Sequence, residues 1–142
     1  MKKSIIDALV EHHEEIRDLM EKGSNNREAF LRLKKHLDIH HQIEEDILLS
    51  KLNEMDGIKD ESLESQEEHF VLNMLLLDLA DFPIDHKRWP VKYKVMSEII
   101  EHHLDEEEED LFPEAKEMLE KSVLEEMGTK FIELKEKQMQ VL

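Results

Sequence analysis

The chain of 142 residues contains no cysteine, only three glycines and three prolines, and few aromatic side chains. The absence of cysteine excludes disulfides, thiolate-bound metals, iron–sulfur clusters and thiol catalysis. The scarcity of glycine and proline beside abundant Leu, Glu and Lys favours long helices with one apolar face. No stretch alternates polar and apolar residues for long enough to predict a strand.

Basic residues are also scarce relative to acids. The 19 Lys and Arg face 36 Asp and Glu, which gives a formal net charge of −17. A field of this sign repels phosphate groups, so we expect neither nucleic acid nor an anionic membrane surface as a partner. The first apolar run ends at Glu11, too early for a signal peptide, and no run is long enough to span a bilayer. We therefore expect a cytoplasmic protein.

Capping signals and apolar spacing predict four long helices. We expect them over residues 4–22, 25–54, 60–79 and 90–112. Pro113 should interrupt the fourth helix, and the remainder should form one or two shorter helices that split near Gly128. The expected architecture is a single all-α domain over residues 1–142. It is an up-down-up-down four-helix bundle with a short C-terminal helical tail.

Two similar segments, HHQIEEDILLSK and HHLDEEEEDLFP, place histidine pairs beside runs of acids. Because each residue turns a helix by about 100°, the apolar residues of each helix define the direction of its core face. On the fourth helix His103 and Glu107 share that direction, whereas His102 points toward solvent. On the second helix His40 and Glu44 fall on the core face, again four residues apart.

The first and third helices each contribute one inward histidine. His13 lies near the middle of the first apolar stripe, and His69 lies within an almost wholly apolar run. A single inward histidine is more often a hydrogen-bonded core residue than a ligand, and an acid run is usually a solvated face. We therefore assign surface or supporting roles to His12, His36, His41, His86 and His102, and solvent-facing positions to Glu106, Glu108, Glu109 and Asp110.

An ionised carboxylate buried in a helical core is costly unless a cation pairs with it. Four inward imidazoles and two inward carboxylates, converging from four helices, would form a cage for two metal ions. Imidazole with carboxylate suits iron, and also manganese or zinc. The candidate ligands are His13, His40, Glu44, His69, His103 and Glu107. None of the nine histidines has glutamate three positions before it, which argues against the Glu-x-x-His pattern of ferritin-like proteins.

These segments resemble the signatures of hemerythrin-like, or HHE cation-binding, domains. HHLDEEEEDLFP has the histidine, the glutamate four positions on and the Leu-Phe-Pro of that pattern, whereas HHQIEEDILLSK has Leu-Leu-Ser in place of the last. EHHEEIRDLM and EEHFVLNMLLLDL resemble the first-helix and third-helix motifs. The resemblance implies a non-haem di-iron centre whose two iron ions can share an oxo bridge. His13 and His40 would bind one iron, His69 and His103 the other, and Glu44 and Glu107 would bridge them.

One position departs from the oxygen-carrying members, which have a second third-helix histidine where this chain has Asn73. The departure implies a more open iron, and Asn73→His should restore the carrier's ligand set. The resemblance implies a protein that binds or senses dioxygen or nitric oxide. The alternatives are a di-iron oxidase, peroxidase or nitric oxide reductase, a protein that repairs iron centres, and a metal-free structural bundle.

Overall fold

The computed structural model describes residues 2–141, which form helices and loops and contain no strand. The elements are α1 Ile5–Lys22, α2 Arg27–Glu44, the π-helical segment η1 Glu45–Leu49, α3 Ser50–Leu52, α4 Lys59–Ala80, α5 Trp89–Glu106, the π-helical segment η2 Glu107–Leu111, α6 Phe112–Met118 and α7 Lys121–Met139. None of the described helices is both long and apolar enough to cross a membrane.

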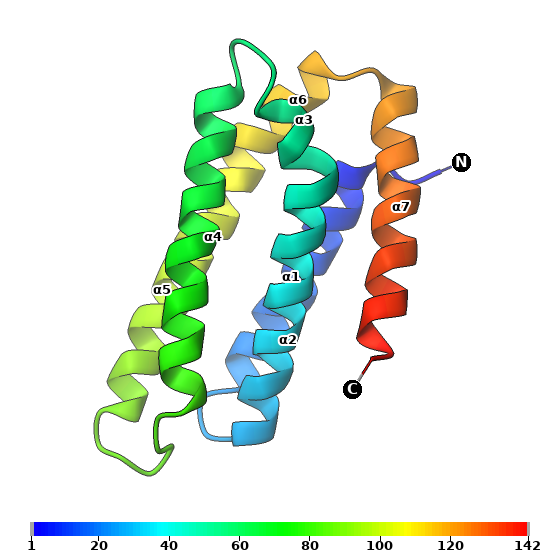
Figure 1. Cartoon of the computed structure of the whole chain (residues 1–142). Helices are drawn as coiled ribbons and strands as arrows, with labels where there is room; N and C mark the ends of the chain where they lie inside the picture. The colour runs from blue at the N-terminus through cyan, green and yellow to red at the C-terminus, as the bar shows by residue number, and fades with distance from the viewer. Residues whose placement is uncertain (1, 142) are drawn as a thin grey trace.

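The helices pack as a bundle, which confirms the all-α prediction. α1 packs against α2 and α5, and α4 packs against the same two helices from the other side. α7 lies along the outside of α1 and α2, away from α4 and α5 (Figure 1). α7 therefore covers the outer side of α1 and α2, and no described helix covers α4 and α5 in the same way.

α1 and α2 begin at capping side chains, whereas Ile58 and Arg88, before α4 and α5, make no side-chain capping hydrogen bond. Ser4 accepts a hydrogen bond from the Asp7 amide at 3.2 Å and caps α1, as expected. The cap of α2 is Asn26, one residue later than predicted, because its side chain accepts from the Ala29 amide at 3.1 Å.

Two expected breaks in the helices were wrong. The chain stays helical through Pro113 to Met118, because Pro113 lies in the first turn of α6, where its missing amide hydrogen is not needed. α7 also continues through Gly128. A Cβ atom there would collide with the Lys3 carbonyl oxygen and come within 2.8 Å of the Ile5 amide nitrogen. Gly128 therefore permits close packing of α7 on the start of α1.

Two π-helical segments interrupt the regular helices beside the inward carboxylates. Glu44 is the last residue of α2, directly before η1, and Glu107 is the first residue of η2. A π-turn adds one residue and so rotates everything after it. Leu49 and Leu52 are accordingly fully buried, whereas Ile47 is only partly buried. Such segments occur frequently at functional sites.

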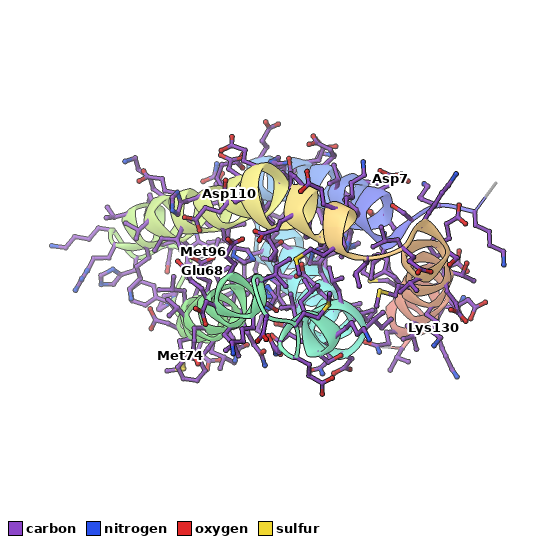
Figure 2. All side chains as sticks on the ribbon, turned by 90° about the horizontal axis from the view of Figure 1, so that it is seen from above. Asp7, Glu68, Met74, Met96, Asp110 and Lys130 are labelled. Atoms are coloured by element: carbon purple, nitrogen blue, oxygen red, sulfur yellow. The ribbon has the colours of Figure 1, made fainter. Side chains whose placement is uncertain are left out.

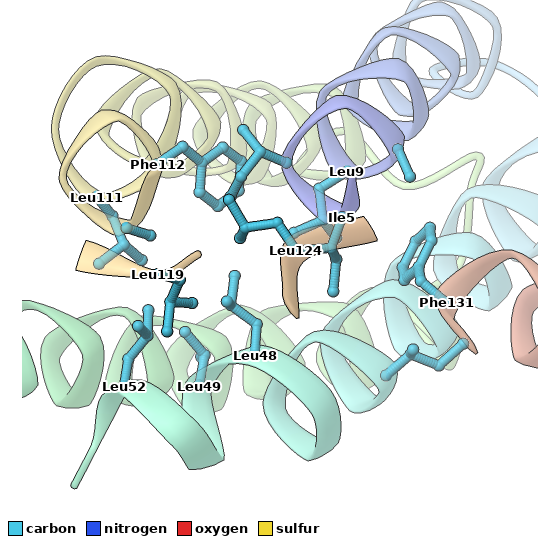
Figure 3. Close-up of a cluster of buried hydrophobic side chains, with 14 of the residues drawn as sticks. Ile5, Leu9, Leu48, Leu49, Leu52, Leu111, Phe112, Leu119, Leu124 and Phe131 are labelled. Atoms are coloured by element: carbon cyan, nitrogen blue, oxygen red, sulfur yellow. The ribbon is translucent and has the colours of Figure 1, made fainter. Parts of the chain in front are cut away.

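The apolar core has two separate clusters. One includes Leu9, Leu48 and Phe112 and lies where α6 and α7 meet the bundle (Figure 3). The other includes Ile16, Leu37, Leu72 and Ile100 toward the opposite end. Along each helix the candidate ligands fall between members of the two clusters, so a polar layer lies between apolar ones. α4 also leaves an apolar face uncovered within the described chain, and Met74 on that face points outward (Figure 2).

Candidate metal centre

The six candidate ligands converge in the polar layer between the apolar clusters. All six are buried, with exposed fractions of 3% or less. Donor atoms of His13, His40 and Glu107 lie within 4.8 Å of one another, and so do those of Glu44, His69, His103 and Glu107. Two ligands of one ion lie at most about 4.4 Å apart, twice a bond of about 2.2 Å. Each group therefore needs only small shifts to surround an ion.

The inward-facing atoms of these side chains have no hydrogen-bond partners among residues 2–141. The unpaired atoms are Nε2 of His13, His40, His69 and His103, both carboxylate oxygens of Glu44, and Oε1 of Glu107. A buried polar atom without a partner costs about 1–3 kcal/mol. Because buried polar groups in native proteins are nearly always satisfied, seven unpaired atoms facing one layer indicate a polar group or cation that they bind.

The carboxylates lie close to the imidazoles without adopting hydrogen-bond geometry. Glu107 Oε1 is 3.3 Å from His13 Nε2 and 3.6 Å from His103 Nε2. Glu44 Oε1 is 3.2 Å from His69 Nε2 and 3.8 Å from His40 Nε2. Glu107 thus lies close to histidines of α1 and α5, and Glu44 lies close to histidines of α2 and α4. Each carboxylate lies between imidazoles of the two groups, as a bridging ligand would.

The other ring nitrogen of each imidazole is held by a partner. His13 donates from Nδ1 to Glu108 at 2.7 Å, His69 to Glu45 at 2.8 Å and His103 to Glu68 at 2.6 Å. His40 Nδ1 lies 2.9 Å from His12 Nδ1. A partner at Nδ1 fixes the tautomer and aims Nε2 inward, which is the usual arrangement around metal-binding histidines.

The pKa values of the two buried carboxylates are shifted in opposite directions. Burial, reinforced by the neighbouring Glu107, raises the pKa of Glu44 well above its usual value. Burial acts the same way on Glu107, but the nearby imidazoles of His103 and His13 outweigh it and hold the pKa of Glu107 well below its usual value. Without a cation, Glu44 therefore favours its protonated form and Glu107 stays ionised.

The pKa values of the buried imidazoles are also shifted in opposite directions. Burial opposes the charge on His13, but the contacts with Glu107 and Glu108 outweigh it and raise the pKa of His13 to about 9. Burial lowers the pKa of His40 well below its usual value and that of His12 to about 2. His13 is thus the counter-ion of Glu107, and metal binding there must displace its proton.

Several buried residues were missed by the helical-phase argument. His12 and His36 are 1% and 6% exposed, and their rings are joined by a contact of 2.9 Å between His12 Nε2 and His36 Nδ1. His12 has the supporting role expected, but neither ring is on the surface. Glu108, expected in solvent, is partly buried between His13 and Arg17, whose Nη1 donates to it at 2.9 Å. No spacing rule marks these partners, because each comes from another helix.

His41, assigned a surface or supporting role from the sequence, is buried with an exposed fraction of 7%. Burial lowers its pKa well below the usual value, so the ring is neutral. His86 and His102 are exposed, as expected. Asn73 is exposed too and is not among the clustered donor atoms in the described part of the chain.

Two surface hollows reach the polar layer. One is lined by acidic side chains and has Ser65 and Glu107 at its base, where Ser65 donates to Glu107 Oε2 at 2.8 Å. The other measures about 600 Å³ and is lined by residues that include His41, His69 and Asn73. The acidic hollow attracts cations, and the second hollow has room for a small ligand.

The geometry can be compared with known proteins. Residues 4–115 match the hemerythrin HHE cation binding domain, and this span includes all six candidate ligands. Comparison with curated proteins and with solved structures gives no match. The match covers more than half of the chain, and it coincides with the helices that carry the buried imidazoles and carboxylates. The chain therefore belongs to the hemerythrin HHE cation-binding domain family.

Proposed function

We propose that this protein is a non-haem di-iron protein that binds or senses dioxygen or nitric oxide. His13 and His40 hold one iron ion, His69 and His103 hold the other, and Glu44 and Glu107 bridge them. The observation that supports this most strongly is the set of inward-facing atoms, on these same six side chains, that have no hydrogen-bond partner among residues 2–141.

The chemistry of the donor set fits iron. Four neutral imidazoles and two carboxylates suit a borderline divalent cation, and no thiolate is present to favour a softer metal. Zinc and manganese accept the same ligands. Two cations would also offset the two buried carboxylates, which the metal-free protein accommodates only by protonation of Glu44 and by pairing Glu107 with His13.

The protein's own contribution is orientation and exclusion of water. With His40 Nε2 on the metal, its Nδ1 carries the proton and donates to His12 Nδ1. His12 then donates from Nε2 to His36 Nδ1, so one tautomer satisfies the whole chain of rings. The apolar clusters on both sides keep bulk water from the centre. A bound iron pair would supply one-electron redox chemistry and coordination sites for small ligands.

An enzyme built on the same centre is the second candidate. The hollow beside His69 has room for peroxide or nitric oxide, the small substrates that such an enzyme would turn over. Steady-state consumption of either molecule by the iron-loaded protein would support this candidate. Binding without turnover would support the sensor or carrier.

The test is anaerobic purification with iron, followed by metal analysis and optical spectra before and after exposure to air. We expect two iron ions per chain and a new absorption of a coupled ferric pair in air. Chelated protein should melt at a lower temperature, because the bound cations stabilise only the folded chain. A protein that retains no metal, and melts at the same temperature with and without chelator, would be the metal-free structural bundle instead.

A further inference from the structure

His41 is a buried histidine on α2 that the six-ligand scheme does not use. Its ring stacks on that of His69, with ring centroids 3.9 Å apart and planes 15° apart. The edge of the ring meets His103, with centroids 5.7 Å apart and planes 90° apart. His41 therefore lies against the imidazoles of α4 and α5, and both His41 and His69 line the hollow described above.

The inward nitrogen of His41 is unpaired in the same way as those of the candidate ligands. His41 Nε2 is buried and has no hydrogen-bond partner within residues 2–141. Its donor atom lies within 4.8 Å of those of His69 and His103, and neither carboxylate belongs to this group of three. Three mutually close nitrogens can share one ion, provided that the His41 ring tilts out of its stack on His69 so that both lone pairs point to the same place.

We propose that His41 Nε2 is a third imidazole ligand of the ion held by His69 and His103. This inference rests on the proposed di-metal function and extends its ligand set. The third nitrogen comes from α2, one residue after His40, rather than from α4. Asn73, one turn after His69 on α4, is exposed and leaves that role to His41.

The alternative is a core histidine held only by stacking. Stacking accounts for the ring's position but leaves the buried Nε2 without a partner, at a cost of about 1–3 kcal/mol. The other buried histidines outside the six ligands behave differently, since His12 and His36 are hydrogen-bonded to each other. A metal bond at Nε2 satisfies the one buried ring nitrogen that the supporting network omits.

The proposal makes the two ions unequal. The ion on the α1 side would have His13, His40 and the two carboxylates, whereas the other would have three imidazoles and the two carboxylates. An octahedral ion with five protein ligands keeps one position for an exogenous ligand, and one with four keeps two. His41 and His69 both line the hollow, so a small ligand that enters it arrives at the ion with three imidazoles.

The direct test is a crystal structure of the full chain loaded anaerobically with ferrous iron, with the ions located by anomalous diffraction. We expect His41 Nε2 at about 2.1–2.2 Å from the ion bound to His69 and His103. Two bound ions with His41 Nε2 more than about 3 Å from both would overturn this inference and leave the proposed function intact. A chain that binds no iron would overturn both.

Variants provide an independent solution test. His41→Gln keeps most of the side-chain volume, and His102→Gln is the control, an exposed histidine outside the ligand network whose ring contacts Glu106. In competition with a chelator, His41→Gln should lose at least about tenfold in affinity for one of its two ferrous ions, while His102→Gln keeps both affinities unchanged. Equal affinities in wild type and His41→Gln would contradict ligation by His41.

Discussion

The two His-His segments of the chain look alike in sequence and differ in the bundle. In the first, His40 and His41 are both buried, whereas in the second His103 is buried and His102 is exposed. The difference is one of register. Glu44 follows the first histidine of its pair by four residues, and Glu107 follows the second histidine of its pair by four.

The position after the inward histidine is buried on both helices. On α5 that position is Leu104, fully buried, and on α2 it is His41. The position before it differs, because α2 also packs against α7 and so buries Ile39, whereas the corresponding His102 faces solvent. The same dipeptide therefore adds a second inward imidazole in one copy and a surface residue in the other.

The largest expected effect contrasts the two carboxylates as ligands. Glu107 belongs to both donor groups and Glu44 to one, so Glu107→Gln should lose both ferrous ions and Glu44→Gln should lose at least one. Metal content after anaerobic loading and desalting measures this directly. Glu109→Gln, in the exposed part of the acid run, is the control and should keep both ions. Full occupancy in Glu107→Gln would show that the centre lies elsewhere.

In the metal-free protein, substitution of Glu44 and of Glu107 should change the unfolding free energy in opposite directions. The folded-state pKa of Glu44 is raised, so its contribution to stability is full below its unfolded pKa and is lost as the pH rises. At pH 7 the folded chain holds a proton on Glu44 that the unfolded chain releases, which costs free energy. Glu44→Gln should raise the unfolding free energy by about 1–2 kcal/mol. Glu107 is ionised beside His13, so Glu107→Gln should lower it by about 1–3 kcal/mol. Urea unfolding at pH 7 would test this, and shifts of the same sign would contradict the assigned charge states.

The metal-free protein should lose stability on both sides of neutrality. Burial lowers the folded-state pKa values of His12, His40 and His41, so their contribution is present above about pH 6.5 and is lost as the pH falls. The pKa of His13 is raised to about 9, so its contribution is full below about pH 6.5 and is lost through pH 9. Urea midpoints at pH 5.5, 7 and 9.5 measure both limbs. His13→Gln should remove the loss of stability between pH 7 and 9.5 and leave the loss at pH 5.5 unchanged.

The smallest effects are expected at the exposed positions that resemble ligands. His102→Ala should leave iron content and melting temperature unchanged, since its ring reaches only the neighbouring Glu106. Asn73→His should also leave the iron spectrum unchanged, because Asn73 is exposed and, in the proposed ligand set, His41 supplies the third nitrogen. A changed spectrum in Asn73→His would mean that position 73 reaches the metal, and that the α4 side is more open than the contacts of His41 imply.

Much of the site follows from helical phase, because His40 and Glu44, like His103 and Glu107, lie on the core side of a single helix. Three features do not follow from it. The π-turns after Glu44 and within 107–111 shift the phase without any local sequence rule. The partners Glu45, Glu68 and Glu108 bind histidines of other helices. α2 buries more of its circumference than its apolar residues predict, because α7 packs against a second side of the helix. For this reason the sequence placed His41 too near the surface.

The central claim is that the unpaired imidazoles and carboxylates hold two metal ions. Native mass spectrometry of the full chain after anaerobic addition of ferrous iron tests it most directly. We predict a mass increase of two iron ions per chain in the wild type and none in the Glu44→Gln, Glu107→Gln double variant. A wild type without added mass, or a double variant that still carries two ions, would contradict the claim.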